Sequence, residues 1–278
     1  MFTLNCKGRL LMIDRPIVMG IINATPDSFY EGSRFMGEEN ILFQAEKMLR
    51  EGADILDIGG QSTRPGSIQL KEDEELSRVI DPIELLFKNF PEAIISIDTY
   101  QPKVAIEAVS AGASIVNDIS AGNMNLEMLA AVGKLNVPYI CMHMQGTPQT
   151  MQKNPHYENL TKELIDFFIR KIDDCKKAGI HDVIIDPGFG FGKTKAHNFE
   201  LLKNLAVFKM LEKPLLVGIS RKSTIYKTLG VTANEALNGT TVLNTIALLN
   251  GANILRVHDV KEAKEAIKLV NEVEALSI

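Results

Sequence analysis

Residues 93–119, AIISIDTYQPKVAIEAVSAGASIVNDI, decide the fold. They begin and end with short runs, 93–97 and 114–119, that are rich in isoleucine and apolar on both faces. Runs of this kind are typical of parallel strands, which are covered on both faces. Together with the helical segment between them, they predict a strand, a helix and a second strand.

The same unit recurs along the chain. Strand-like runs alternate with helical segments, and the eight runs are residues 17–22, 54–58, 93–97, 114–119, 137–142, 182–185, 215–219 and 253–257. Eight such units in 278 residues predict an α/β protein with a (β/α)₈ barrel, typically about 250 residues long. A doubly wound open sheet is the alternative. The barrel is preferred because no domain-sized remainder is left, so we expect one domain over residues 1–278.

Several local patterns refine this prediction. Residues 2–13, around Lys7-Gly8-Arg9, predict a short N-terminal β-hairpin. Thr232 with Glu235, and Asp259 with Glu262, have the spacing of a capping box at a helix start. Apolar stripes of helical spacing predict buried faces in two helical segments. Their members are Leu164, Phe167, Phe168, Ile172 and Cys175 in the fifth segment, and Ala263, Ile267, Val270 and Val273 in the last.

Composition excludes several classes of protein. Thirty basic and thirty-five acidic side chains give a net charge of −5, which disfavours nucleic-acid binding by bulk charge. Three scattered cysteines without a CxxC motif support neither a disulfide framework nor a zinc site. We see no secretion signal and no stretch apolar enough to span a membrane. The sequence therefore predicts a cytoplasmic protein without membrane or nucleic-acid partners.

Nearly every strand-like run ends, on its C-terminal side, in a polar or charged residue. Because the carboxyl ends of barrel strands meet at one mouth, these side chains predict a shared site. The long connections 24–38, 59–73 and 143–157 lie at the same end and favour this reading over drift in loop length. The polar residues are Asn23, Asp57, Asp98, Asn117, Asp118, His143, Asp186, Ser220, Arg221, Lys222, Arg256 and His258.

The acceptors among them suit a ligand that presents several N–H donors, such as a fused aminopyrimidinone. Asp98, Asn117 and Asp186 are the preferred acceptors. Charge-assisted hydrogen bonds of this kind contribute about 1.5–3 kcal/mol each. An aspartate at a strand end also caps helices or pairs with a nearby lysine, and for Asp57 the two interpretations are evenly balanced.

The cations suit an oligo-anion such as pyrophosphate. Arg256 and His258 are two residues apart, so both are expected on one side of their strand. Lys222 and Arg221 end the preceding strand, and loops at this place in barrels commonly hold phosphate. Arg64 adds a cation from the second loop, although a solvated surface role is the alternative. Without paired histidines, any metal would bind through Asn23 and substrate oxygens, a set that favours Mg²⁺.

Nine motifs in combination resemble the dihydropteroate synthase family. The resemblance runs from Val18 to about Val260 and implies a (β/α)₈ barrel, a homodimer and a sulfonamide target. One departure is Gln61, where the family often has glutamate. The motifs are 19–29 MGIINATPDSF, 57–60 DIGG, 62–66 STRPG, 96–99 SIDT, 116–119 VNDI, 142–146 MHMQG, 186–193 DPGFGFGK, 220–223 SRKS and 256–260 RVHDV.

The resemblance also implies substrates and roles. The enzyme would be a transferase that joins 6-hydroxymethyl-7,8-dihydropterin diphosphate to p-aminobenzoate, by a Mg²⁺-assisted, SN1-like displacement of pyrophosphate. Asn23 would bind Mg²⁺. The pterin would contact Asp98, Asn117, Asp186 and Lys222. The pyrophosphate would contact Thr63, Arg64, Arg256 and His258. The p-aminobenzoate would contact Phe191, Lys222 and Ser223. The catalytic set would be Asp98, Lys222, Arg256, His258 and Arg64.

Other functions remain open at this point. A methyltransferase that carries methyl groups from methyltetrahydrofolate to a corrinoid protein would share the aspartate and asparagine set. It would have no use for the cations Arg64, Arg256 and His258. A non-catalytic pterin-binding protein would tolerate their loss. The fold alone would also permit a phosphosugar isomerase or lyase.

Overall fold

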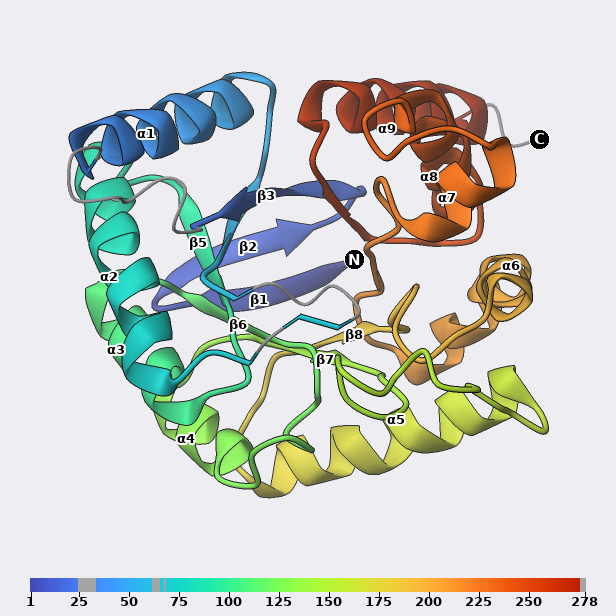
Figure 1. Cartoon of the computed structure of the whole chain (residues 1–278), viewed down its shortest axis with the longest axis horizontal. Helices are drawn as coiled ribbons and strands as arrows, with labels where there is room; N and C mark the ends of the chain where they lie inside the picture. The colour runs from blue at the N-terminus through green and yellow to red at the C-terminus, as the bar shows by residue number, and fades with distance from the viewer. Residues whose placement is uncertain (25–33, 62–65, 68, 276–278) are drawn as a thin grey trace.

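Eight parallel strands form a closed barrel in the computed structural model (Figure 1), which describes residues 1–24, 34–61, 66–67 and 69–275. The strand order is β8-β7-β6-β5-β4-β3-β10-β9. A parallel bridge between Ile185 and Leu215 joins the two ends of the sheet, so the predicted barrel is confirmed. The strands are β3 (Ile17–Asn23), β4 (Ile55–Gly59), β5 (Ile94–Asp98), β6 (Ile115–Asp118), β7 (Tyr139–Met142), β8 (Val183–Asp186), β9 (Leu216–Val217) and β10 (Ile254–Val257).

Helices surround this barrel (Figure 1), and the main apolar core lies between them and the strands. Among the described residues, no helix is long and apolar enough to cross a bilayer. The helices are α1 (Arg34–Arg50), α2 (Glu72–Asn89), α3 (Pro102–Ala111), α4 (Met128–Leu135), α5 (Leu160–Lys177), α6 (Lys195–Lys203), the 3₁₀ helix η2 (Leu205–Leu211), α7 (Ser223–Leu229), α8 (Leu237–Leu249) and α9 (Val260–Ala275).

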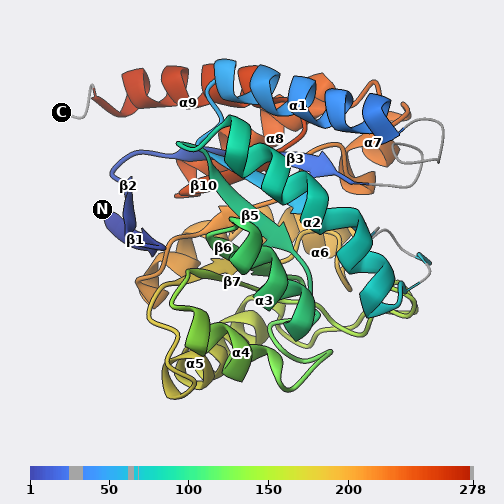
Figure 2. The same ribbon diagram turned by 90° about the vertical axis from the view of Figure 1, so that its left-hand side faces the viewer.

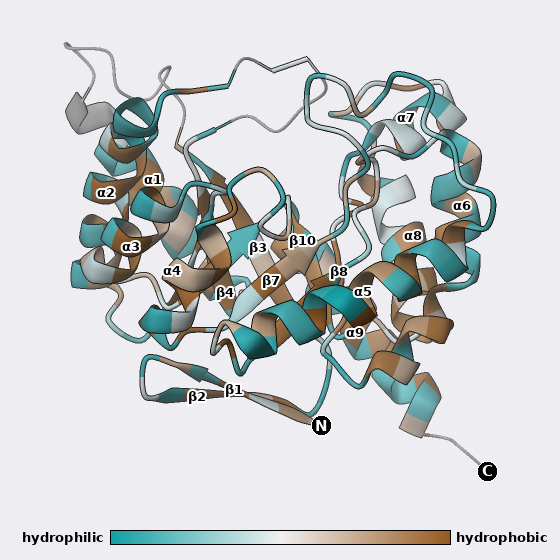
Figure 3. Ribbon diagram, turned by 90° about the horizontal axis from the view of Figure 1, so that it is seen from below, coloured by the Kyte–Doolittle hydropathy of each residue, from teal (hydrophilic) through white to brown (hydrophobic). Residues whose placement is uncertain are grey.

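The predicted N-terminal hairpin lies at the amino end of the barrel. Its strands are β1 (Phe2–Cys6) and β2 (Arg9–Ile13), and Lys7 and Gly8 between them both have positive φ, as a two-residue type I′ turn requires. Figures 2 and 3 show the hairpin at the end opposite the loops that follow the strands. Its inner side packs on a second apolar cluster, so the floor of the barrel is closed. That cluster contains Leu4, Cys6, Ile13, Ile17, Met19, Ile55, Ile94, Ile115, Ile140, Ile184, Leu216 and Ile254.

The helix predictions hold with three corrections. The stripe on α5 is buried or packed on the core, and so is the stripe on α9 as far as Val270. Val273 is 66% exposed, because the last turn of α9 extends past the barrel. Thr232 and Glu235 do bond to each other, but α8 begins only at Leu237.

The third correction concerns the start of α9. The helix begins at Val260, directly after Asp259, as the spacing predicts. The carboxylate of Asp259, however, accepts two hydrogen bonds from the Arg221 guanidinium, at 2.7 and 2.8 Å. A charged partner from a neighbouring loop therefore takes the place of a backbone cap.

One carboxyl group is buried in the first turn of α2. Glu75 is 1% exposed, and this burial raises its pKa to about 7, although Thr99 and Gln101 oppose the shift. The folded protein therefore holds a proton here between pH 4.5 and about 7 that the unfolded chain has lost. The free energy of unfolding must fall as the pH rises through this window.

We predict that Glu75→Gln is more stable than the unchanged protein at pH 8, by about 1–3 kcal/mol, because the neutral amide has no charge to desolvate. Urea unfolding followed by circular dichroism measures the difference. It should shrink toward zero well below pH 4.5, where Glu75 is protonated in both states. Glu84→Gln, at an exposed position of the same helix, is the control. A difference that does not depend on pH would contradict the shift in pKa.

Candidate active site

Strand register gathers the predicted acceptors at one end of the barrel. Asn23 pairs with Gly59, Gly59 with Asp98, and Asp98 with Asn117, so these four residues form one row across β3, β4, β5 and β6. Gly59 contributes no side chain, and a Cβ there would lie 3.6 Å from the Cβ of Asp98. Asp186 ends β8, on the other side of the same mouth.

Arg256 is held between two carboxylates at this mouth. Its Nε donates to Asp57 Oδ2 at 2.6 Å, and its Nη2 donates to Asp98 Oδ2 at 2.7 Å. Asp57 and Asp98 are both buried. Burial raises the pKa of Asp98, and the Arg256 guanidinium opposes this. Burial would lower the pKa of Arg256, but the two carboxylates together raise it, so the arginine stays charged.

Asp57 thus pairs with a cation, as its alternative interpretation held, but the cation is Arg256 and lies inside the site. The same carboxylate oxygen accepts from Asn117 Nδ2 at 3.1 Å. Asp57 therefore orients both Arg256 and Asn117. Its position within β4, near the carboxyl end, does not by itself distinguish this orienting role from a direct contact with a ligand.

A second group of side chains surrounds Asp186. Asp186 Oδ1 accepts from the backbone N–H of Gly188 at 2.7 Å. A Cβ on Gly218 would lie 4.0 Å from Asp186 Oδ2 and 3.9 Å from the Cβ of Arg256, so the two groups flank the same glycine. Burial raises the pKa of Asp186, and Lys222 and the Gly188 N–H oppose the shift.

Lys222 connects this group to an aromatic wall. Its ammonium donates to the carbonyl of Phe189 and lies 4.6 Å from the ring centroid of Phe191. Burial lowers the pKa of Lys222 to about 8, and Asp186 opposes this. A partly desolvated ammonium beside a carboxylate and over a ring suits a flat, polar heterocycle.

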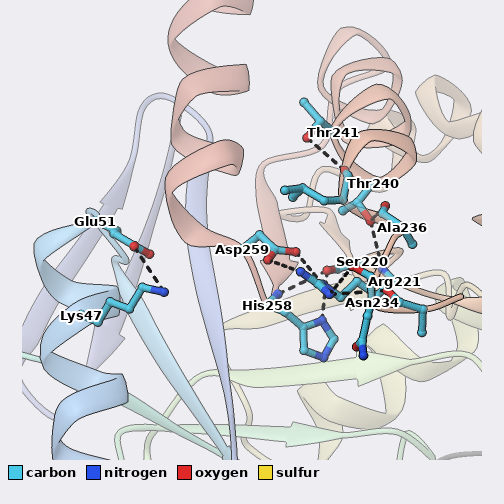
Figure 4. A network of polar contacts seen from close by, with 12 residues as sticks. Lys47, Glu51, Ser220, Arg221, Asn234, Ala236, Thr240, Thr241, His258 and Asp259 are labelled. Carbon is cyan, nitrogen blue, oxygen red and sulfur yellow. Dashed lines mark hydrogen bonds and ion pairs between the residues drawn. The ribbon is translucent and has the colours of Figure 1, made fainter.

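The cations expected at the rim divide into two kinds (Figure 4). His258 is exposed, and its Nδ1 lies 3.0 Å from Ser220 Oγ, a contact that fixes the ring. Arg221 instead pairs with Asp259 and donates to the carbonyl of Asn234. Arg221 is therefore a clamp between the loop after β9 and the start of α9, and the expectation that it faces the anion is wrong.

Two further predicted residues lie where they are accessible. Asn23 is exposed at the end of β3, and Ser223 is exposed at the start of α7. Thr63 and Arg64 lie outside the described residues. Gln61 is buried, and its Oε1 accepts from the backbone N–H of Leu70 at 3.3 Å, so an uncharged side chain suffices to bond across this loop.

The donor set fits Mg²⁺ only in a substrate-assisted manner. The described residues contain no group of three histidine, cysteine, aspartate or glutamate side chains that could hold a metal. The single amide oxygen of Asn23 is available at the mouth. An ion that keeps several waters and takes phosphate oxygens, as Mg²⁺ does, needs no more from the protein.

Three polar residues have roles that the sequence did not reveal. Asp118 is buried behind the strands and accepts from the Tyr139 hydroxyl at 2.6 Å, so it is structural. His143 is also buried, and its Nδ1 lies 3.0 Å from the Nζ of buried Lys193. Their strand-end positions alone resemble those of the ligand-facing residues. A signal for Lys193 was its place directly after the glycine-rich run.

Comparison with known proteins agrees with this geometry. The chain matches the model of the pterin binding enzyme family over residues 19–258. It is 44% identical over 270 residues to dihydropteroate synthase of Escherichia coli, and the match covers 95% of this chain and 94% of that protein.

Solved structures are similar along the whole chain. Dihydropteroate synthase of Yersinia pestis, solved with a sulfonamide drug, has a TM-score of 0.92 and 42% identity, covering 99% of this chain and 100% of that one. The Xanthomonas albilineans enzyme has been solved with 4-aminobenzoic acid (TM-score 0.91, 40% identity) and with 7,8-dihydropteroate (0.87, 36%), each covering 99% of both chains. On the family match and these identities, the chain belongs to the dihydropteroate synthase family of pterin binding enzymes.

Proposed function

We propose that this protein joins 6-hydroxymethyl-7,8-dihydropterin diphosphate to p-aminobenzoate, giving 7,8-dihydropteroate and pyrophosphate. The observation that carries the proposal is the convergence of Asp98, Asn117 and Asp186 with Arg256 and Lys222 at one barrel mouth. Its relatives support it, because structures of one of them hold 4-aminobenzoic acid and 7,8-dihydropteroate.

The pterin ring would lie deepest. Its row of N–H groups matches the acceptors Asp98, Asn117 and Asp186, and its carbonyl oxygen matches the Lys222 ammonium. Asp98 and Asp186 are buried, so hydrogen bonds to them are poorly screened by water. Since Asp57 already orients Asn117, the amide is set before the ligand arrives.

The diphosphate would lie nearer the rim. Arg256 uses Nε and Nη2 for the two carboxylates and makes no Nη1 hydrogen bond to the described residues, so Nη1 is available to an anion. His258 stands on the same strand end and is exposed. We expect Thr63 and Arg64 to complete the anion site from the second loop. Asn23 would hold Mg²⁺, which would supply charge neutralisation of the diphosphate.

The bond changes favour a dissociative, SN1-like path. The bond between the pterin methylene carbon and the diphosphate oxygen breaks, and both electrons leave with pyrophosphate. Arg256 and His258 would stabilise that leaving charge, and carboxylates such as Asp98 the electron-poor methylene. The aniline nitrogen of p-aminobenzoate then bonds to the methylene and loses one proton to solvent.

The second substrate would bind over the pterin. Phe191 is buried with its ring beneath Lys222, and exposed Ser223 follows on α7. An aromatic ring and a cation next to each other match the ring and carboxylate of p-aminobenzoate. The aniline nitrogen would then lie near the methylene carbon. A corrinoid methyltransferase would leave the cations at the rim without use, and we find no observation that favours it.

We also propose that the protein is a homodimer. Apolar side chains are exposed on α8 and α9, which pack against each other. An exposed apolar face of this kind favours an interaction surface. Its residues are Val242, Ile246, Leu249, Leu269 and Val273. A cytoplasmic location is consistent with three free, buried cysteines and remains a prediction.

The reaction itself is the first test. Incubation with the pterin diphosphate, p-aminobenzoate and Mg²⁺ should yield dihydropteroate and pyrophosphate in equal amounts. Chromatography measures the dihydropteroate, and a phosphate assay measures the pyrophosphate. Omitting any one of the three should abolish product. Binding of the pterin without turnover would instead favour a non-catalytic pterin-binding protein.

Arg256→Lys is expected to weaken binding of the pterin diphosphate by about tenfold or more, because the planar fork of donors is lost while one charge stays between Asp57 and Asp98. Binding of the pterin alcohol, which lacks the diphosphate, should change much less. Fluorescence titration gives both dissociation constants, and Arg170→Lys, an exposed position, is the control. Equal losses for both ligands would assign Arg256 to the ring alone.

The dimer is tested by Leu269→Asp. A charge on the exposed face of α9 should halve the mass measured by light scattering after gel filtration, with an unchanged circular dichroism spectrum. Leu126→Asp, at another exposed leucine, should leave the mass unchanged. A monomeric unchanged protein would refute the dimer, and a dimeric Leu269→Asp variant would refute this surface.

A further inference from the structure

The loop between β8 and α6 is held through its carbonyl groups. From Gly188 to Gly192, every carbonyl oxygen accepts a hydrogen bond from a side chain. Gly188 and Phe191 accept from Lys193 (3.1 Å each), Phe189 from Lys222, Gly190 from Gln152 (2.7 Å) and Gly192 from the Tyr157 hydroxyl (2.8 Å). Such a loop is fixed in place by its surroundings more than by its own backbone.

Two glycines bring this loop against the segment after β7. Gly188 and Gly192 have φ of +72° and +60°, a region that other residues rarely adopt. A Cβ on Gly188 would lie 1.9 Å from the carbonyl oxygen of His143, and one on Gly192 would lie 2.5 Å from that of Gln145. The loop therefore has close contact with residues 143–145 and little freedom to shift.

Lys193 occupies the centre of this arrangement. It is 2% exposed, and all of its three donors are used, since its Nζ also lies 3.0 Å from His143 Nδ1. No carboxylate is hydrogen-bonded to it among the described residues, which is uncommon for a buried lysine. The burial lowers its pKa to about 7, while Asp186 opposes the shift. Burying this group costs stability, so its position calls for another explanation.

The Lys193 contacts lead directly to ligand-facing groups. Gly188, whose carbonyl accepts from Lys193, donates its N–H to Asp186 Oδ1 at 2.7 Å. Phe191, whose carbonyl accepts the second bond, has its ring beneath the Lys222 ammonium. Both residues would shift if the lysine were removed. Asp57, Asp98, Asn117 and Arg256 lie on other strands and form no hydrogen bond with it.

We infer that Lys193 is a positioning residue for one half of the active site: its ammonium ties Gly188 and Phe191 to His143 and thereby fixes Asp186 and the wall formed by Phe191 and Lys222. This inference rests on the proposed function, because it assigns that half to the pterin ring and p-aminobenzoate. Under this inference the half of the site that contains Asp186 and Phe191 is held by a loop, and the half that contains Asp98 and Asn117 is held by strands.

Lys193→Met tests it, because methionine keeps the length of the side chain and removes all three donors. We expect its dissociation constant for the pterin diphosphate and its KM for p-aminobenzoate each to rise about tenfold or more. Turnover at saturation should fall much less, because the leaving-group cations stay in place. Lys195→Met, an exposed lysine two residues away, should stay within about twofold of the unchanged protein.

His143 provides a second test, should Lys193→Met fail to fold. His143→Asn keeps an acceptor for the ammonium, whereas His143→Leu removes it. We expect the leucine variant to bind the pterin diphosphate several-fold more weakly than the asparagine variant. Equal affinities of these two variants would overturn the inference.

The outcomes separate this inference from the proposed function. An unchanged protein that neither binds the pterin diphosphate nor forms product refutes the proposed function. An active protein whose Lys193→Met variant matches Lys195→Met in both constants refutes only the positioning role. The same holds if Lys193→Met lowers the melting temperature but its folded form binds with unchanged affinity, since that result describes a purely structural lysine.

Discussion

The pairing of Arg256 with Asp57 and Asp98 is the constraint on which the site depends. These side chains come from three of the four neighbouring strands β5, β4, β3 and β10, so Arg256 reaches across β3 to both carboxylates. Buried charges destabilise a protein strongly when one partner is missing. Two buried carboxylates and one guanidinium leave an excess of negative charge, which matches a ligand that presents N–H donors.

The mouth is built in two ways. One half stands on strands, where register alone aligns Asn23, Asp98 and Asn117 in a row. The other half stands on a loop, whose glycines and buried ammonium hold Asp186 and Phe191. The backbone of a strand is fixed by hydrogen bonds to the neighbouring strands of the barrel, whereas the backbone of this loop is fixed by hydrogen bonds from side chains. The buried Lys193 ammonium therefore fixes the backbone of the loop, whereas the buried Asp57 beside the row only orients side chains on strands that register already places.

Sequence alone predicts the barrel, its hairpin and the convergence of polar strand-end residues at one mouth, because apolar runs and strand-end polarity follow directly from a parallel barrel. It does not separate Asp98 from Asp118, because both end strands and only three-dimensional packing turns one outward, toward Tyr139. The pairing of Arg221 cannot be predicted for a similar reason, because its partner Asp259 lies 38 residues away along the chain. Val273 follows the apolar spacing of α9 but lies beyond the barrel that covers the rest. The role of Asp57 is likewise hidden in the sequence, because its partner Arg256 comes from a strand far along the chain.

The apolar floor beneath the strands governs how ligands move. Because the hairpin and its isoleucine layer fill the amino end, a small molecule reaches Asp98 from the carboxyl ends of the strands as far as the described residues go. Binding and release are then ordered, because a molecule bound near the rim blocks dissociation of a molecule that lies deeper in the barrel. A rim-bound compound would therefore prolong the residence of the deeper ligand without touching it.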